Sequence, residues 1–287
     1  MRRANAVAKE IVQVTTVEDL TSVFESLAST QVAKVKNKVE LSKEFFQLLW
    51  SKYTSIRVDP KTRITNRAVG GAGYEKVFVI ISAEAGLSGD IDLRLIETMM
   101  KDYDKETTDI VVLGSHGANQ LAQRGISYSR FFQVPETDTY IDVTPVVESI
   151  LPYASVVIYY EEYISLGVQE IKTIDLMSTM RAMSDGTDGE DTMTSIDTIF
   201  EPSLEEIANQ MEMTMMNLAL SQTILESSLA QAASRFNAMA LAKKQANEML
   251  TKYLLEFHRA KRAESDRQLR EVMLSLKKKK NRTGGNR

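Results

Sequence analysis

The stretch from Ser203 to Lys280 constrains the fold of this chain most, because it contains no glycine and no proline. Its commonest residues are good helix formers. Ser203 followed by Glu206 is the pattern of a helix N-cap. An unbroken helix here would be roughly 110 Å long, at about 1.5 Å per residue. A compact domain cannot enclose such a helix, so the sequence predicts an extended rod.

Apolar side chains recur along this stretch at the 3.5-residue period of a coiled coil. One heptad position is apolar throughout, whereas the other is broken by Gln222 and Lys243. The seam stops in the charged run 261–268, and we expect the rod to leave its first partner near residue 261. The two rows are Met215, Gln222, Leu229, Phe236, Lys243, Leu250 and Phe257, and Leu218, Leu225, Ala232, Met239, Ala246, Tyr253 and Ala260.

A second stretch without glycine or proline runs from Ala4 to Asp59. Its apolar residues between Ala28 and Ile56 alternate steps of four and three, which is again a coiled-coil pattern. Pro60 ends it, because the residue before a proline disfavours helix. The sequence predicts a helix of roughly 50 residues that pairs with the C-terminal rod as an antiparallel coiled coil.

The middle of the chain alternates apolar runs of strand length with helical patterns. The runs Val77–Ser82, Ile110–Leu113 and Val156–Tyr160 predict buried strands, and Val168–Met177 predicts a further, antiparallel strand. Such alternation indicates a mostly parallel sheet with helices on both faces, and therefore an α/β fold. The predicted parts are an N-terminal helix over 1–60, an α/β domain over 61–199, and a C-terminal helix with a basic tail over 200–287.

Composition excludes several classes of function. The chain has no cysteine, which rules out disulfides and thiol chemistry, and two histidines argue against a His-rich metal site. A net charge of −4 argues against nucleic acid as a partner. No apolar run is long enough to predict a membrane span. We expect a cytoplasmic protein that can lie beside a membrane as part of a larger complex, with no cofactor.

Two glycine-containing turns were weighed as ligand sites. GLSGD at 86–90 follows a strand but lacks the lysine of a phosphate loop and the third glycine of a dinucleotide loop. GSHG at 114–117 places His116 on a turn after a strand, without a nucleophile or carboxylate pair that the sequence can place beside it. The sequence therefore predicts no catalytic, cofactor-binding or metal residue. An α/β enzyme that uses these two turns stays as an alternative.

Two other candidates for chemistry are assigned structural roles. Glu161 and Glu162 are expected at the solvated end of a strand, rather than in acid–base work. The methionine-rich run 211–216 matches the spacing of a helical packing face and is expected in the core.

The two ends of the chain, taken together, resemble the gamma subunit of F-type ATP synthases. The family's Y-E-P-S before its last helix is similar to Phe200–Ser203, and its A-S-E-x-x-A-R-M-x-A-M segment is similar to AQAASRFNAMALAKKQANEM at 230–249. The family's S-D-x-G-L-C-G-x-x-N resembles SAEAGLSGDID at 82–92, and its first helix resembles Ile11 through Gln31. The resemblance spans nearly the whole chain and is most specific over 200–272.

The resemblance implies a non-catalytic rotor shaft with a Rossmann-like α/β domain at its base. Its implied partners are alpha-like and beta-like ATPase subunits in a surrounding ring, together with an epsilon-like subunit and a membrane rotor ring or another load. The implied ring contacts are Phe24, Lys261 and Arg262, and the implied rotor-base contacts are Gly86, Leu87, Gly89, Phe200 and Glu201.

The chain departs from the family at three places. Glu18 and Asp19 are acidic where the family is basic, Lys261–Arg262 replaces Arg-Gln, and the tail after Leu276 is basic. These departures are what a specialised F-type-like motor would show, and the output stays open between proton flow, sodium flow and a mechanical load such as motility. A coiled-coil adaptor that never rotates is the other alternative.

Overall fold

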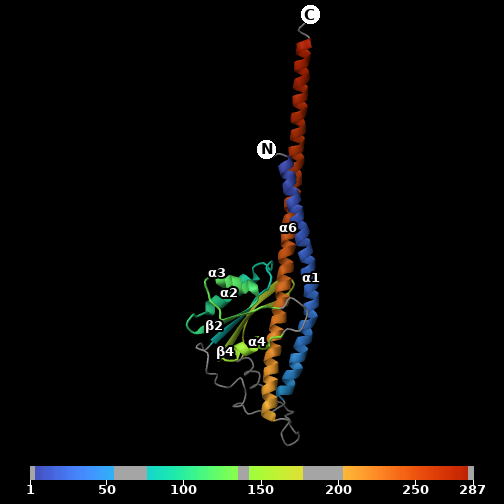
Figure 1. Ribbon diagram of the computed structural model, residues 1–287. Helices are drawn as coiled ribbons and strands as arrows, with labels where there is room; N and C mark the ends of the chain where they lie inside the picture. The colour runs from blue at the N-terminus through green and yellow to red at the C-terminus, as the bar shows by residue number, and fades with distance from the viewer. Residues whose placement is uncertain (1–3, 55–75, 135–141, 177–202, 284–287) are drawn as a thin grey trace. The chain divides into compact units, whose positions relative to one another are not determined.

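The computed structural model describes residues 4–54, 76–134, 142–176 and 203–283 (Figure 1). These residues fall into two compact units, which are described separately. One unit contains residues 27–238, and the other contains residues 1–26 with 239–287. Two long helices, α1 (Ala4–Thr54) and α6 (Leu204–Thr283), contribute residues to both units.

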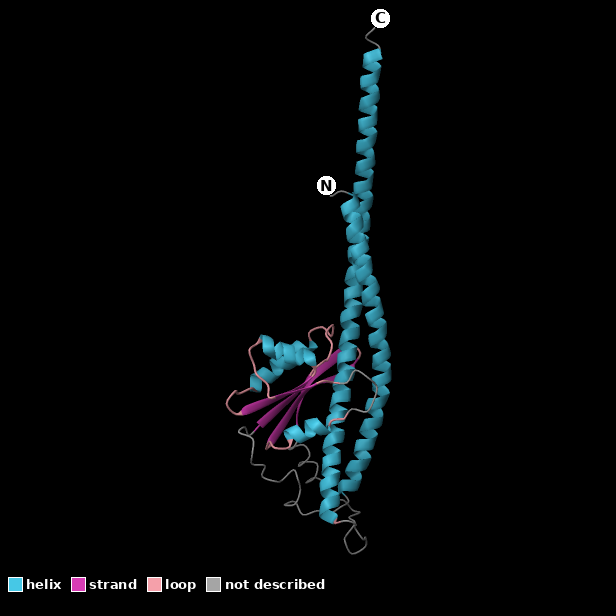
Figure 2. Ribbon diagram, viewed as in Figure 1, coloured by secondary structure: helices cyan, strands magenta, loops and turns pink. Residues whose placement is uncertain are grey.

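The unit of residues 27–238 is built around one five-stranded sheet of order β3-β2-β1-β4-β5 (Figure 2). β1 is parallel to β2 and to β4, β2 is parallel to β3, and β5 is antiparallel to β4. The predicted parallel sheet with one antiparallel strand is therefore confirmed. The strands are β1 (Lys76–Ile81), β2 (Thr108–Leu113), β3 (Arg130–Phe132), β4 (Ser155–Ser165) and β5 (Val168–Asp175).

Helices cover both faces of this sheet. Successive residues of a strand point to opposite faces, so neighbouring residues of β1 pack against different helices. Phe78 and Ile80 of β1 pack with Leu95 and Leu121, on the face of helices α2 (Ile91–Asp102) and α3 (Ser115–Gln123). The other face is covered by α4 (Thr144–Ile150) and by α6. Its core consists of alternate strand residues and apolar residues of these helices, among them Val77, Val79, Ile81, Ile150, Met215, Met216, Leu220 and Ile224.

The methionine-rich run of α6 lies in this core, as predicted. Met215 and Met216 are fully buried in the cluster that also contains residues of β1, β2 and β4. The N-terminus of α6 begins as the sequence predicts, because the Glu206 amide donates to Ser203 Oγ over 3.2 Å. Between Met215 and Ser234 the helix is buried on more than one side, since both the sheet and α1 cover it.

In the same unit, α1 packs antiparallel to α6 (Figure 1). Val35 and Val39 of α1 form a small core with Leu229, whereas Phe46 lies against the sheet cluster that contains the earlier α6 residue Met215. The predicted antiparallel pair is thus confirmed here. The predicted seam positions of α1 in this unit are all buried or half-buried, at residues 28, 32, 35, 39, 42, 46 and 49.

The other unit pairs the first part of α1 with the second part of α6. Here the predicted positions of α6 are all buried or half-buried, at residues 239, 243, 246, 250, 253, 257 and 260. The expected end of the seam is also confirmed. From Glu264 to Lys277 every described side chain of α6 is exposed.

Candidate functional site

The loop of residues 86–90, called here the base loop, is tied to α6 by two side-chain hydrogen bonds, and a third holds Ala85 just before it. Arg235 donates from Nε to the Gly86 carbonyl over 3.3 Å and from Nη2 to the Ala85 carbonyl over 3.0 Å. Ser234 Oγ donates to the Ser88 carbonyl over 2.7 Å. The loop between β1 and α2 is therefore held by a helix almost 150 residues further along the chain.

Leu87 stands out in this loop, because it combines a strained backbone with an exposed apolar side chain. Its φ is +71°, a conformation that costs a leucine of order 1–2 kcal/mol, and its side chain is 54% exposed. Strained residues of this kind are concentrated at functional sites. The base loop thus brings together Gly86, Leu87 and Gly89, three of the predicted rotor-base contacts.

The other two predicted base contacts, Phe200 and Glu201, lie outside the described residues.

A buried polar cluster lies behind the base loop. The Asp92 carboxylate is fully buried at the start of α2. Its Oδ1 accepts from the Ala83 amide over 2.9 Å, and its Oδ2 accepts from Ser88 Oγ over 2.8 Å. The predicted candidate His116 places Nδ1 2.9 Å from the same Oδ2, and its side chain is 30% exposed. His116 is therefore a partner of a structural carboxylate.

Glu161 completes this cluster, and the prediction that it lies at the solvated end of a strand is wrong. β4 continues to Ser165 because β5 pairs with it as far as that residue, and α6 covers it from the other side. The side chain of Glu161 is fully buried, and its Oε2 accepts from Ser227 Oγ over 3.1 Å. Burial, followed by the negative charge of Asp92, raises the pKa of Glu161 well above its ordinary value.

The GSHG turn is closed by the chain's own groups. Ser82 Oγ accepts from the Gly117 amide over 2.9 Å, and a side chain at Gly114 or Gly117 would collide with Ser82. The Glu84 carboxylate accepts from the amide and the hydroxyl of Ser115 at the start of α3. In nucleotide-binding α/β proteins an anionic ligand binds at such a helix start, after the carboxyl end of a strand. Here a carboxylate of the protein holds that position, which argues against the enzyme alternative.

The predicted ring contacts lie on the unit of residues 1–26 and 239–287, but not in one cluster. Phe24 is 37% exposed on α1, and its neighbour Glu25 bonds to Lys243 of α6. Lys261 lies 18 residues further along α6, or about 27 Å at the helical rise. Its Nζ lies 5.9 Å from the ring centre of Phe257, and Arg262 beside it is exposed. The structure therefore places these residues at two levels of the helix pair.

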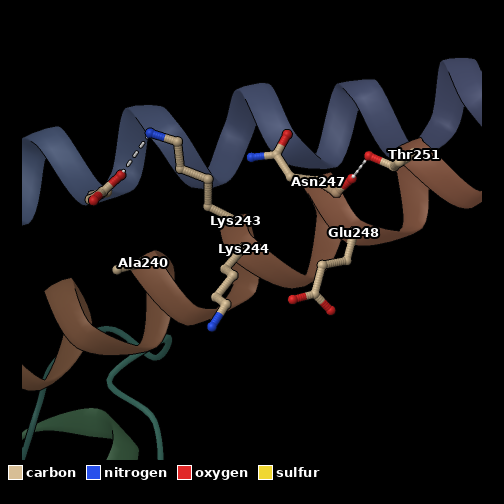
Figure 3. A pocket seen from close by; sticks show the side chains of 7 residues that line it. Ala240, Lys243, Lys244, Asn247, Glu248 and Thr251 are labelled. Atoms are coloured by element: carbon tan, nitrogen blue, oxygen red, sulfur yellow. Dashed lines mark hydrogen bonds and ion pairs between the residues drawn. The ribbon is translucent and has the colours of Figure 1, made fainter.

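A shallow hollow lies beside the ion pair of this unit (Figure 3). Lys243 Nζ is 3.0 Å from a carboxylate oxygen of Glu25, so the lysine that interrupts the apolar row has an acidic partner on the facing helix. The hollow has a volume of about 480 Å³ and no histidine in its lining, which consists of Glu25, Ala240, Lys243, Lys244, Asn247, Glu248 and Thr251.

Sequence reasoning missed the residues that join α6 to the domain. Ser227, Gln231 and Ser234 are polar positions of α6 at spacings of four and three. That spacing places them on one helix face, and it was the available signal for a polar contact with another element. Over the ranges that the structure describes, no group of three His, Cys, Asp or Glu side chains has the geometry of a metal site. None of the helices in those ranges could span a membrane.

The sequence matches the ATP synthase family model over residues 3–276. It is 21% identical to the ATP synthase gamma chain of Clostridium novyi, covering 93% of this chain and 95% of that one. It is 22% identical to the gamma chain of Halothermothrix orenii, covering 95% and 98%. Each alignment spans almost the full length of both proteins.

Solved structures show the same fold. A chain of the Tetrahymena thermophila mitochondrial ATP synthase, in a structure of its central stalk and c-ring, superimposes with a TM-score of 0.58 and 16% identity. That match covers 78% of this chain and 99% of the other. A chain of the Euglena gracilis mitochondrial ATP synthase gives a TM-score of 0.57 at 12% identity, covering 90% and 95%.

Proposed function

This chain belongs to the ATP synthase gamma-chain family, and we infer that it is the central shaft of an F-type or F-type-like rotary ATPase. The observation that carries this inference is the α1–α6 pair, whose second helix continues past its covered seam with exposed side chains. A helix that is fully exposed over Glu264–Lys277 would be marginal by itself, because helices gain most of their stability from packing. It therefore fits a partner that surrounds it.

The exposed part of α6 has a face suited to such a partner. Leu269, Val272, Met273 and Leu276 follow the spacing of one helix face, and Met273 is 70% exposed. Exposed apolar surfaces of this kind mark interaction sites. We call these four residues the C-terminal apolar face. They would contact the ring of alpha-like and beta-like subunits, and Lys261 and Arg262 would pair with acidic ring residues.

In this proposal the chain carries no catalytic residue of its own. ATP would be hydrolysed or made on the ring, and the shaft would contact each ring subunit differently. A rotor couples to its catalytic sites only through such differences in contact free energy between states. The proposed ring contacts, apolar at Phe24 and charged at Lys261–Arg262, would lie at two levels of the shaft.

The base loop is the proposed contact with the load. Leu87 presents an apolar side chain, and Arg235 and Ser234 fix the loop to α6, so that force on the loop is passed to the helix. The partner here would be an epsilon-like subunit, a membrane rotor ring or another load. This would place the chain in the part of the complex that is peripheral to the membrane. A specialised output such as motility fits this proposal as well as ion flow does.

Native purification of the full chain from the cells that make it tests this proposal. Two related ATPase subunits should be recovered in excess over the chain, together with ATP hydrolysis. A chain that ends at residue 263 should lose ring association, because it lacks the C-terminal apolar face. A matched chain that ends at Lys277 keeps that face and should retain it. Recovery of this chain only with itself and without ATPase activity would favour a non-rotating adaptor.

A further inference from the structure

Two fully buried carboxyl groups lie close together, one at the start of α2 and one on β4 beneath Ser227 of α6. Asp92 at the start of α2 already has three partners, namely the Ala83 amide, Ser88 Oγ and His116 Nδ1. Glu161 on β4 has one hydrogen-bond donor at Oε2, the Ser227 hydroxyl. Its second oxygen, Oε1, is buried without a hydrogen-bond partner among the described atoms.

This arrangement is short of one proton donor. A buried oxygen atom without a hydrogen-bond partner destabilises the folded state, and a charged one does so more. A protonated carboxyl group is itself a donor. If Glu161 carries a proton, its hydroxyl can donate a hydrogen bond to Asp92. The two carboxyl groups then carry one negative charge in total. Burial and then the charge of Asp92 raise the pKa of Glu161. Hydrogen bonds with Gln231 and Ser227 lower it, but the net shift is upward.

The other charged groups around the pair have partners of their own. From β5, Lys172 pairs with Glu162 at 2.6 Å. From α6, Arg235 donates to the carbonyls of Ala85 and Gly86. Glu226 of the same helix adds a negative charge, which together with the larger effect of burial raises the pKa of Tyr160. From α3, His116 contacts Asp92 and is partly exposed, so it connects the pair to solvent.

We propose that Glu161 and Asp92 share one proton, and that this proton makes the contact between α6 and the sheet dependent on pH. With the proton present, Ser227 and Gln231 of α6 close over the pair, since Gln231 Nε2 donates to Ser227 Oγ over 3.0 Å. Without it, two buried negative charges would repel each other beneath α6. This inference rests on the geometry of the cluster and is independent of the proposed function.

The base loop would follow the same proton. Asp92 holds the loop from inside through the Ala83 amide and Ser88 Oγ, while Ser234 of α6 holds Ser88 from outside. Loss of the proton should therefore loosen α6 around residues 224–235 and the base loop together. Helix α2 and strand β2 should change less.

The sign of the pH dependence follows from the raised pKa. Between the ordinary glutamate pKa of 4.5 and the raised value, the folded chain holds a proton that the unfolded chain has lost. Stability is therefore present at low pH and falls as the pH rises through this range. One proton changes the folding equilibrium by up to about tenfold per pH unit.

Urea unfolding of the full chain from pH 5 to pH 9 tests this expectation. Glu161→Gln keeps the shape of the protonated acid but cannot ionise. The folding equilibrium constant of this variant, divided by that of the wild type, should therefore rise with pH by up to about tenfold per unit. Glu170→Gln removes an equal charge from an exposed position of β5 and should follow the wild type. Equal pH slopes for wild type and Glu161→Gln would overturn the proposal.

A measurement on the wild-type chain keeps the test independent of any variant's folding. The side-chain carboxyl carbon of Glu161 should titrate in carbon-13 NMR spectra of the folded chain well above the range of an ordinary glutamate. Amide exchange over residues 224–235, corrected for its intrinsic pH dependence, should accelerate as that titration proceeds. A Glu161 that titrates like an exposed glutamate would show that no proton is shared.

Discussion

At the scale of single residues, Leu87 shows how the base loop is suited to a partner. A leucine with a positive φ is strained by about 1–2 kcal/mol, and the exposed side chain gains little packing in return. The glycines of the sequence predicted the turn. The sequence did not show that Leu87, and not only a glycine, would have a positive φ. That depends on how Arg235 and Ser234 of α6 hold the neighbouring carbonyls.

Leu87→Asn should separate stability from binding. Asparagine tolerates a positive φ better than leucine, so the isolated chain should keep its stability or gain up to about 1 kcal/mol. Binding to the load should weaken, because the exposed apolar side chain is lost. Thermal unfolding and co-purification of the partner at the base loop measure the two effects. A variant that loses stability and keeps its partner would contradict this role for Leu87.

Arg235→Ala should loosen the base loop. The substitution removes the donors to the carbonyls of Ala85 and Gly86, and because Arg235 is only partly buried we expect a loss of about 1–2 kcal/mol in the free energy of unfolding. Arg124→Ala is the matched control, since the described side-chain hydrogen bond of Arg124 goes to Gln120 of the adjoining helix α3 and not to the base loop. Urea unfolding of both variants makes the comparison, and equal losses would count against the anchoring role.

The burial of Glu161 could not be predicted from its neighbours in the sequence. The apolar run of β4 leads into Glu161 and Glu162, and two successive acids are usually solvated at a strand end. Alternation places them on opposite faces of the sheet, but it does not show which face a distant helix covers. Glu161 is buried because Asp92 of α2 and Ser227 of α6, which is 66 residues away, both lie against it.

At the scale of elements, prediction succeeded where a local period sets the structure. All the heptad-row positions of α6 between Met239 and Ala260 are buried or half-buried, because α1 covers one seam there. Between Met215 and Ser234 the same rows were incomplete, since the sheet covers a second side of α6. A heptad pattern does not predict that the sheet also packs against α6.

Lys243 and Glu25 should contribute to the pairing of α1 with α6 through their ion pair. A double-mutant cycle with Lys243→Ala and Glu25→Ala should give a coupling of about 0.2–1 kcal/mol, because both side chains are partly exposed. The coupling should shrink in 1 M salt, where the screening length is about 3 Å. Urea unfolding at both salt concentrations measures it. A coupling that does not change with salt would mean that packing, and not charge, joins the two residues.

Lys243→Leu addresses the specificity of the same contact. Leucine would restore the apolar row and should raise the stability of the helix pair, since a polar residue at a seam position lowers stability while it fixes the register. If Lys243 has that second role, a spin-label distance between α1 and α6 should broaden in this variant. An unchanged, narrow distance would assign Lys243 no part in the register.

At the scale of the whole molecule, assembly with the ring should depend on the C-terminal apolar face. Leu269→Asp should leave the unfolding of the isolated chain almost unchanged, because Leu269 is exposed. It should lower ring association and ATP-driven rotation in the proposed complex. Leu274→Asp is the matched control, since Leu274 is exposed on α6 but lies off that face. Equal effects of the two substitutions would argue against a specific face.

The pairing of α1 with α6 also determines when this protein can finish folding. Glu25 and its partner Lys243 are 218 residues apart in the chain. At about 5–20 residues per second, the ribosome needs roughly 10–40 s to make the second helix after the first. The sheet needs no residue beyond Asp175, so its strands are complete earlier. The apolar seam of a newly made α1 therefore stays exposed until α6 has been synthesised. Chaperones would be needed most during that interval.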